Sequence, residues 1–229
     1  MSRLDRAVRR RLQRHDAPRV LTAPMLVRLA DSERPGVSRG AVTLLAKELC
    51  EDGDLGRAAR GLYLIRRLPV PACIAEAAPY IRRGAIVSLH SVLGDAGVLN
   101  NYTHDVWCVV PMSGRNTTSL RPSEGANGVS FVFRGIREER LFAPARSDLL
   151  ADEPYPRATI EAALCHWLYL WKMPQSDMGK LPGDLDLEGF DVERATRIAE
   201  AMGIQDAFGD WLASADFDYE QDVAPGLGF

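Results

Sequence analysis

Residues 37–65, VSRGAVTLLAKELCEDGDLGRAARGLYLI, decide the fold of the first part of this chain. Ser38 is suited to begin a helix, because its hydroxyl can accept a hydrogen bond from an unpaired backbone N–H in the first turn. Four apolar residues then share one helical face: Val42, Leu45, Ala46 and Leu49. The pattern predicts a helix that ends at Asp52-Gly53. A hairpin follows, in which residues 56–61 turn between Leu55 and the strand-like residues 62–65.

The segments before this helix complete a helix-turn-helix pattern. Residues 3–15 predict a first helix that Pro18 ends, and residues 24–31 predict a second one with Pro24 in its first turn. A third helix with a basic outer face, followed by a hairpin with a basic tip, is typical of a winged helix-turn-helix. That motif places its helix in the major groove of DNA and its hairpin against the backbone or the minor groove. The sequence therefore predicts a DNA-binding domain over residues 1–68.

The predicted DNA contacts come from three places in this domain: Arg39, Thr43, Lys47, Arg57, Arg60 and Arg10. Arg39 and Thr43 project from the first turns of the third helix, where base edges are read, whereas Lys47 lies one turn further on and suits a phosphate. Arg57 and Arg60 are placed at the hairpin tip. Arg10 is placed on the first helix, where Arg9 and Arg14 also lie, and at most half of these arginines are expected to contact the duplex backbone.

The charge distribution favours two different partners for the two parts of the chain. The net charge is −3, but residues 1–70 hold 15 Lys/Arg against 8 Asp/Glu, and the remaining residues hold 13 against 23. A basic front suits a polyanion and predicts salt-sensitive binding. Four widely spaced cysteines without a C-x-x-C pair, and the lack of a long apolar run, favour a reduced cytoplasmic protein that is not in a membrane.

The rest of the chain predicts a second, mixed α/β domain over residues 72–215, so the overall class is α+β. Residues 69–71, Pro-Val-Pro, predict a stiff linker before it, and residues 216–229 an acidic tail after it. Helices are expected over 74–82, 86–96, 156–172, 191–202 and 204–214. Strands are expected over 106–110 and 129–133, with a possible third at 140–142, which gives a small sheet.

Three segments, in this order, resemble the AbiEi family of antitoxins from type IV toxin–antitoxin systems. Residues 60–63, Arg-Gly-Leu-Tyr, are similar to the close of that family's N-terminal domain. Residues 86–93, IVSLHSVL, look like the small-residue helix that opens its second domain. Residues 161–170, EAALCHWLYL, are similar to a family helix usually written EKALLDLLYL, with Ala162 and His166 as departures.

The resemblance implies a two-part function. The first domain would bind repeats in its own promoter, as two or more copies or a homodimer on the DNA, and repress the operon. The second would counteract a nucleotidyltransferase-type toxin. The aromatic-rich helix over 161–170 is either core or, where it is exposed, a protein-partner surface that includes Glu161, His166 and Trp167.

No catalytic, cofactor-binding or metal-binding constellation can be assembled from the sequence. Cys165 and His166 are neighbours, so on a helix their side chains diverge and cannot act as a nucleophile–base pair. No histidine spacing indicates a metal site. The prediction is a non-enzymatic protein without a cofactor.

Two alternatives stay open. The first is a stand-alone transcription regulator whose second domain senses a small molecule, which a pocket with convergent polar groups would favour. The second is an enzyme that uses its winged helix to find nucleic acid, which a cluster of acidic or histidine side chains in one cleft would favour.

Overall fold

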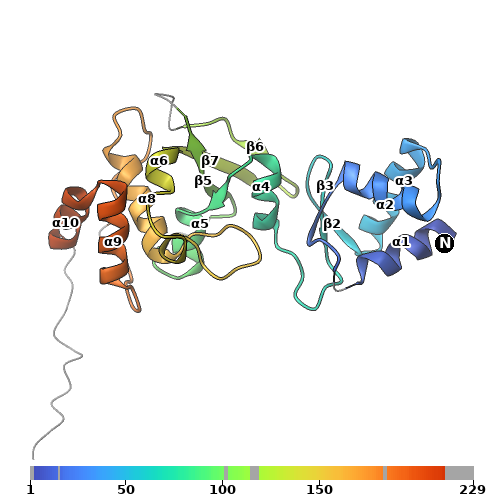
Figure 1. The fold of residues 1–229 in the computed structure, drawn as a ribbon, viewed down its shortest axis with the longest axis horizontal. Coiled ribbons are helices and arrows are strands. Elements are labelled where there is room, and N and C mark those ends of the chain that lie inside the picture. Colours follow the sequence, from blue (N-terminus) through green and yellow to red (C-terminus); the bar gives the residue numbers. More distant parts are fainter. Residues whose placement is uncertain (1–2, 15, 101–102, 114–118, 183–184, 215–229) are drawn as a thin grey trace, which may run out of the picture.

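The computed structural model describes residues 3–14, 16–100, 103–113, 119–182 and 185–214 (Figure 1). The predicted acidic tail, residues 216–229, lies outside the described residues. The described chain combines several helices with two small sheets, and this confirms the predicted α+β class.

The N-terminal elements are helices and short strands. In order they are α1 (Arg3–Leu12), β1 (Val20–Thr22), α2 (Ala23–Glu33), α3 (Arg39–Glu51), β2 (Leu55–Ala59) and β3 (Leu62–Ile65). The strands form an antiparallel sheet in the order β1-β3-β2, so the strand before α2 pairs with the last strand. Figure 1 shows these helices on one side of the sheet and the rest of the chain on the other.

Side-chain caps begin the second and third helices. The backbone N–H of Met25 donates to Thr22 Oγ1 at 3.3 Å, and Pro24 occupies the first turn of α2. At α3 the N–H of Ala41 donates to Ser38 Oγ at 3.2 Å. The helix predicted after Ser38 is therefore confirmed, with its apolar face buried.

The hairpin differs from the predicted one. Strand β2 continues through Ala59, so that only Arg60-Gly61 turns the chain, with Gly61 at a φ of +72°. Arg57 lies within β2 opposite Tyr63, and its predicted place at the tip is wrong. Arg60 remains at the tip.

The remaining elements surround a second, mixed sheet in the order β4-β5-β7-β6, in which β5 and β7 are parallel. Its strands are β4 (Ile86–Val87), β5 (Val106–Met112), β6 (Ser123–Glu124) and β7 (Ser130–Arg137). The helical elements are η1 (Ile74–Ala77), α4 (Ala78–Ile81), α5 (His90–Asp95), α6 (Glu138–Leu141), α7 (Arg146–Leu149), α8 (Ile160–Lys172), α9 (Val192–Met202) and α10 (Gln205–Ser214).

Two predicted elements in this region are wrong. The helix expected over 86–96 begins only at His90, because Ile86–Val87 pairs with β5 as a strand and Leu89 takes a left-handed φ of 55°. The strand expected over 140–142 is occupied by the end of helix α6, which directly follows β7.

Buried apolar residues form two clusters, and the small sheet belongs to both. The first cluster lies between the N-terminal helices and one face of the β1-β3-β2 sheet. The second cluster fills the larger sheet and its helices, and it also takes residues from the N-terminal strands: Val20, Ala58, Ala59, Leu62 and Leu64. The N-terminal unit (residues 3–68) therefore packs on the second unit (residues 72–214) through a sheet that is covered on both faces.

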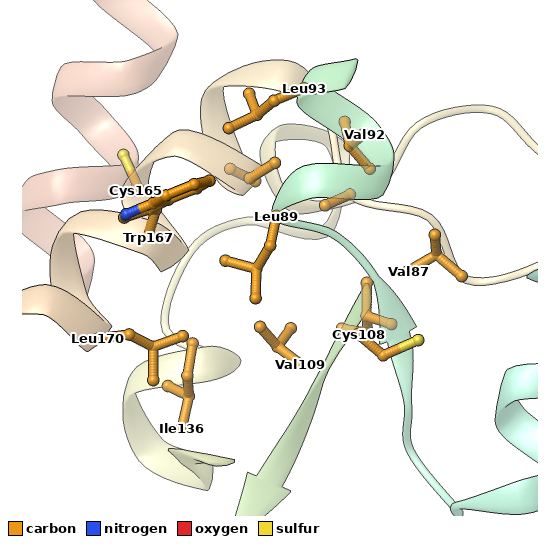
Figure 2. Close-up of a cluster of buried hydrophobic side chains, with 14 of the residues drawn as sticks. Val87, Leu89, Val92, Leu93, Cys108, Val109, Ile136, Cys165, Trp167 and Leu170 are labelled. Atoms are coloured by element: carbon orange, nitrogen blue, oxygen red, sulfur yellow. The ribbon is translucent and has the colours of Figure 1, made fainter. Parts of the chain in front are cut away.

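Helix α8 lies at the centre of the larger cluster. Its residues 161–170 are all buried. Figure 2 shows Cys165, Trp167 and Leu170 of this helix among side chains from α5, β5 and β7. Apart from Glu161 and His166, residues 161–170 are apolar around the whole helix, which is the pattern of a core helix.

Candidate nucleic-acid interface

The outer face of α3 carries the residues that the sequence predicts as base contacts. Arg39, Thr43 and Lys47 are all exposed. The Thr43 hydroxyl donates to the carbonyl of Arg39 at 3.0 Å, which leaves its oxygen free to accept a hydrogen bond. Lys47 lies 3.5 Å from Glu51 one turn later, but both side chains are well exposed, so this ion pair holds the ammonium weakly.

A groove of about 500 Å³ runs between α2, α3 and β3. Arg39 and Thr43 line it from α3, Arg28 from α2 and Tyr63 from β3. Arg28 was not among the predicted contacts. The sequence could have indicated it, because Arg28 lies on the face of α2 opposite the buried residues Leu26 and Ala30 and is therefore exposed.

The hairpin brings two arginines to the same part of the unit. The N–H of Ala23, the first residue of α2, donates to the carbonyl of Gly61 at 2.8 Å, so the turn at Arg60-Gly61 lies against the beginning of α2. Arg57 lies near α3. Burial raises the pKa of the Cys50 thiol, and the charge of Arg57 acts against that shift. Both arginines are exposed.

Of the three arginines predicted to lie on the first helix beside DNA, two form ion pairs within the protein. Arg9 donates to Asp5 at 2.7 Å and to Asp52 at 2.5 Å, and it also pairs with Asp54. Its guanidinium therefore joins α1 to the end of α3, which agrees with the expectation that only part of the arginines of this helix contact DNA. Arg14 pairs with Asp16 at 3.3 Å. Arg10 remains exposed.

Several arginines of this unit carry uncompensated charge. Within the described chain, no hydrogen bond or ion pair is formed by the guanidinium groups of Arg10, Arg28, Arg39, Arg57 and Arg60. Exposed guanidinium groups without carboxylate partners are available to phosphates, and they need not break an existing pair to bind one.

Of the two alternatives for the helix over 161–170, the core is confirmed, because the three residues of the alternative partner surface are buried. The exposed fractions of Glu161, His166 and Trp167 are 4%, 0% and 5%. Glu161 accepts from the N–H of Asp191 at 3.2 Å, and Trp167 Nε1 donates to the carbonyl of Gly179 at 2.9 Å. These side chains hold α8 within the second unit and leave no surface for a partner.

The side chains of His166 and Cys165 are buried and contact other core groups. His166 Nδ1 lies 2.8 Å from Ser88 Oγ, and burial lowers the pKa of this histidine to about 3. The Cys165 thiol donates to the carbonyl of Ala195 at 3.6 Å, and burial raises its pKa far above the ordinary range.

Among the residues that the structure describes, no three His, Cys, Asp or Glu side chains are grouped to hold a metal ion. Nor does any helix in the described ranges have the length and apolarity to cross a bilayer.

No protein-family model matches the chain, and no curated protein matches it significantly. The crystal structure of the Rv2827c protein from Mycobacterium tuberculosis is similar at 17% sequence identity, over 93% of this chain and 82% of that chain, with a TM-score of 0.49. Similarity at this level assigns neither a family nor a function to the chain.

Proposed function

We propose that the chain is a DNA-binding autorepressor whose N-terminal unit is a winged helix. The observation that carries the proposal is the groove between α2 and α3, where Arg28 and Arg39, unpaired within the described chain, lie beside Thr43. The element order β1-α2-α3-β2-β3 supports it, because this order places a helix and a hairpin turn on one side of the unit.

In the proposed complex α3 enters the major groove. Arg39 and Thr43 contact base edges, and arginine suits guanine because it can donate two parallel hydrogen bonds. Arg28, Lys47 and Arg60 contact phosphates on either side. One such unit reads few base pairs, so two or more copies bind repeated sites in the promoter of the chain's own gene.

The second unit is proposed to act as an antitoxin against a nucleotidyltransferase-type toxin. This part rests on the resemblance of residues 60–63, 86–93 and 161–170 to AbiEi antitoxins. Because Glu161, His166 and Trp167 are buried, any surface that counteracts the toxin lies elsewhere on the unit. Co-expression of the full chain with a neighbouring nucleotidyltransferase-type gene tests this function, and growth arrest that the chain does not relieve would contradict it.

The DNA-binding proposal is tested by titrating the full chain with its own upstream DNA over a series of salt concentrations. The variant Arg28→Ala/Arg39→Ala is compared with Arg137→Ala/Arg146→Ala, which removes the same charge from exposed arginines of the second unit. We expect the first variant to reduce the slope of log K against log salt by about 1, for the lost phosphate contact of Arg28, and to weaken the preference for the base that Arg39 contacts. The control variant should retain the wild-type slope. Wild-type binding no stronger than binding to random DNA would overturn the proposal.

A second candidate function, a regulator that senses a small molecule, is favoured by one pocket of the second unit. The pocket has a volume of about 230 Å³ and is lined by polar groups that include His90, Tyr155 and Arg157. Arg157 donates to Asp95 at 3.0 Å and to the Tyr155 hydroxyl at 3.3 Å. His90 Nδ1 is buried and, among the described residues, has no hydrogen-bond partner. A screen of small polar metabolites for changes in DNA affinity tests this candidate, and Thr103→Trp, which narrows the pocket, should abolish any true response.

A further inference from the structure

The hairpin of the N-terminal unit is joined to the second unit by backbone contacts. The N–H of Ala126 donates to the carbonyl of Ala58 at 2.7 Å, and Ala59 forms an antiparallel bridge with Gly125. These bonds satisfy part of the otherwise open edge of β2. The loop at residues 125–129 therefore lies beside the hairpin. Its bridge partner Ala59 is the residue directly before Arg60 at the hairpin tip.

The approach at Gly125 is too close for a side chain. A Cβ on Gly125 would lie 3.1 Å from the carbonyl oxygen of Ala58 and 2.8 Å from that of Val129. Together with the shared apolar cluster, this contact fixes the second unit relative to the hairpin and α2. The surface next to the loop consequently has a defined position with respect to the proposed DNA-binding groove.

That surface carries arginines. Arg82, at the end of α4, lies with its guanidinium 5.0 Å from the centre of the Phe133 ring and donates to the carbonyl of Arg121 at 3.3 Å. Arg83 and Arg121 are exposed, and neither forms an ion pair within the described chain. Glu124, in β6, is an exposed acid beside them. Figure 1 shows α4 and β6 next to the hairpin.

The separation suits one DNA duplex. Arg121 precedes Gly125 by four residues, which span at most about 14 Å of extended chain. Gly125 in turn bridges Ala59 of the hairpin. Arg121 and the hairpin tip are therefore close enough to meet phosphates on the same flank of a bound site, whose base pairs follow each other at about 3.4 Å.

We propose that the DNA-binding surface continues from the hairpin onto the second unit, where Arg83 and Arg121 contact the phosphate backbone beside the site. Arg82 is a positioning residue, since it holds the segment at Arg121 against the sheet. The contact is independent of sequence, because it reaches phosphates and no base edges. This inference rests on the proposed function, and it assigns a DNA contact to a unit whose overall charge is acidic.

The inference is tested on the full chain with its own upstream DNA. In Arg83→Ala/Arg121→Ala both changed side chains are exposed, so the fold should be retained, which thermal unfolding checks. We expect the slope of log K against log salt to fall by about 2. Hydroxyl-radical footprints should also lose protection on the hairpin side over at most about 4 base pairs, which is the greatest span of about 14 Å divided by the spacing between base pairs. The variant Arg137→Ala/Arg146→Ala, with the same change in charge, should alter neither quantity.

The possible results separate the two proposals. If both double variants lower affinity and slope equally, only the total charge matters and the inference is overturned. If wild type binds its upstream DNA specifically but Arg83→Ala/Arg121→Ala leaves slope and footprint unchanged, the inference fails alone. If wild type does not bind specifically, the proposed function and the inference fail together.

Discussion

Arg19 and Glu76 form a two-pronged ion pair that joins the N-terminal sheet to the second unit. Arg19 Nε lies 2.7 Å from one carboxylate oxygen of Glu76 and a terminal nitrogen lies 2.8 Å from the other. The same guanidinium donates to the carbonyls of Val70 and Pro71 at 3.0 and 3.3 Å. Glu76 is only 3% exposed and also accepts from the N–H of Cys73. The pair thus fastens the linker as well as both units.

Removal of this arginine should destabilise the whole chain. Arg19→Ala leaves the buried carboxylate of Glu76 without its cation, and we expect the free energy of unfolding to fall by about 3 kcal/mol. Urea denaturation measures the change. The control is Arg11→Ala, which breaks the more exposed pair with Glu33 at 3.5 Å and should alter stability by less than about 1 kcal/mol. Equal effects of the two variants would show that the Arg19–Glu76 pair does not hold the units together.

Gly125→Ala should loosen the contact between the hairpin and the second unit. The new methyl group would meet backbone oxygens of Val129 and Ala58, which cannot turn away as a flexible side chain can. Overpacking of this kind costs about 1–3 kcal/mol. Gly209→Ala is the matched control, because its methyl group meets nothing within 4 Å in α10. That variant should gain about 0.5–1 kcal/mol from helix propensity and reduced freedom of the unfolded chain. Thermal unfolding of the two variants should therefore shift in opposite directions.

Trp167 should behave as a core residue. Its ring lies 4.3 Å from the ring of His90, centre to centre, and its Nε1 donates to Gly179. We expect Trp167→Ala to lower the free energy of unfolding by about 3–5 kcal/mol. Phe142, which is 49% exposed, supplies the comparison, and Phe142→Ala should lower it by less than about 1 kcal/mol. A Trp167→Ala protein of wild-type stability would restore the surface interpretation of α8.

Stability should fall as the pH drops below about 6.5, and His166 should contribute to the slope. The folded pKa of His166 is lowered to about 3 by burial, so below its ordinary value of 6.5 the unfolded chain binds a proton that the folded chain does not. The free energy of unfolding then decreases by about 1.4 kcal/mol per pH unit between those two values. His90, whose pKa is lowered to about 4 by burial and by Arg134, acts in the same direction.

The measurement is urea denaturation of wild type and His166→Gln at several pH values between 6 and 5, above the range in which most carboxylates titrate. The variant changes the contact with Ser88, which shifts its stability by a similar amount at each pH. Its stability should nevertheless depend less steeply on pH. Parallel curves for the two proteins would refute the role assigned to His166.

Local signals in the sequence were enough for the helices of the N-terminal unit. Ser38 as a cap and the spacing of Val42, Leu45, Ala46 and Leu49 need only nearby residues, and α3 formed as predicted. Strand β1 escaped prediction because its three residues pair with β3, some 40 residues later. Ile86–Val87 was misjudged for the same reason, since β5 provides its partner.

Glycines explain the error in the hairpin. Gly56 suggested a turn, but it lies within β2, where the guanidinium of Arg66 lies over it. Only Gly61 takes the left-handed backbone that turns the chain. The sequence alone does not distinguish a glycine within a strand from a glycine that forms a turn. The turn was therefore predicted to begin at Gly56, which placed Arg57 at the tip of the hairpin.

The candidate site was only partly predictable. Arg39, Thr43, Lys47, Arg60 and Arg10 are exposed as expected, since helix and turn geometry determine their direction. The sequence did not show which arginines of α1 are paired, because the partners of Arg9, Asp52 and Asp54, come from the end of α3 and the loop after it. On α8 the run of apolar and aromatic residues already favoured a core helix, and the burial of residues 161–170 confirms that alternative.

Both faces of the β1-β3-β2 sheet are packed against other parts of the chain. Without the second unit, a fragment ending at the linker would present Val20, Leu62 and Leu64 to solvent beside the open edge of β2. Such a surface favours self-association through strand pairing. The N-terminal unit is therefore poorly suited to fusion with an unrelated protein. Such a fusion protein would also need apolar residues to cover this face of the sheet.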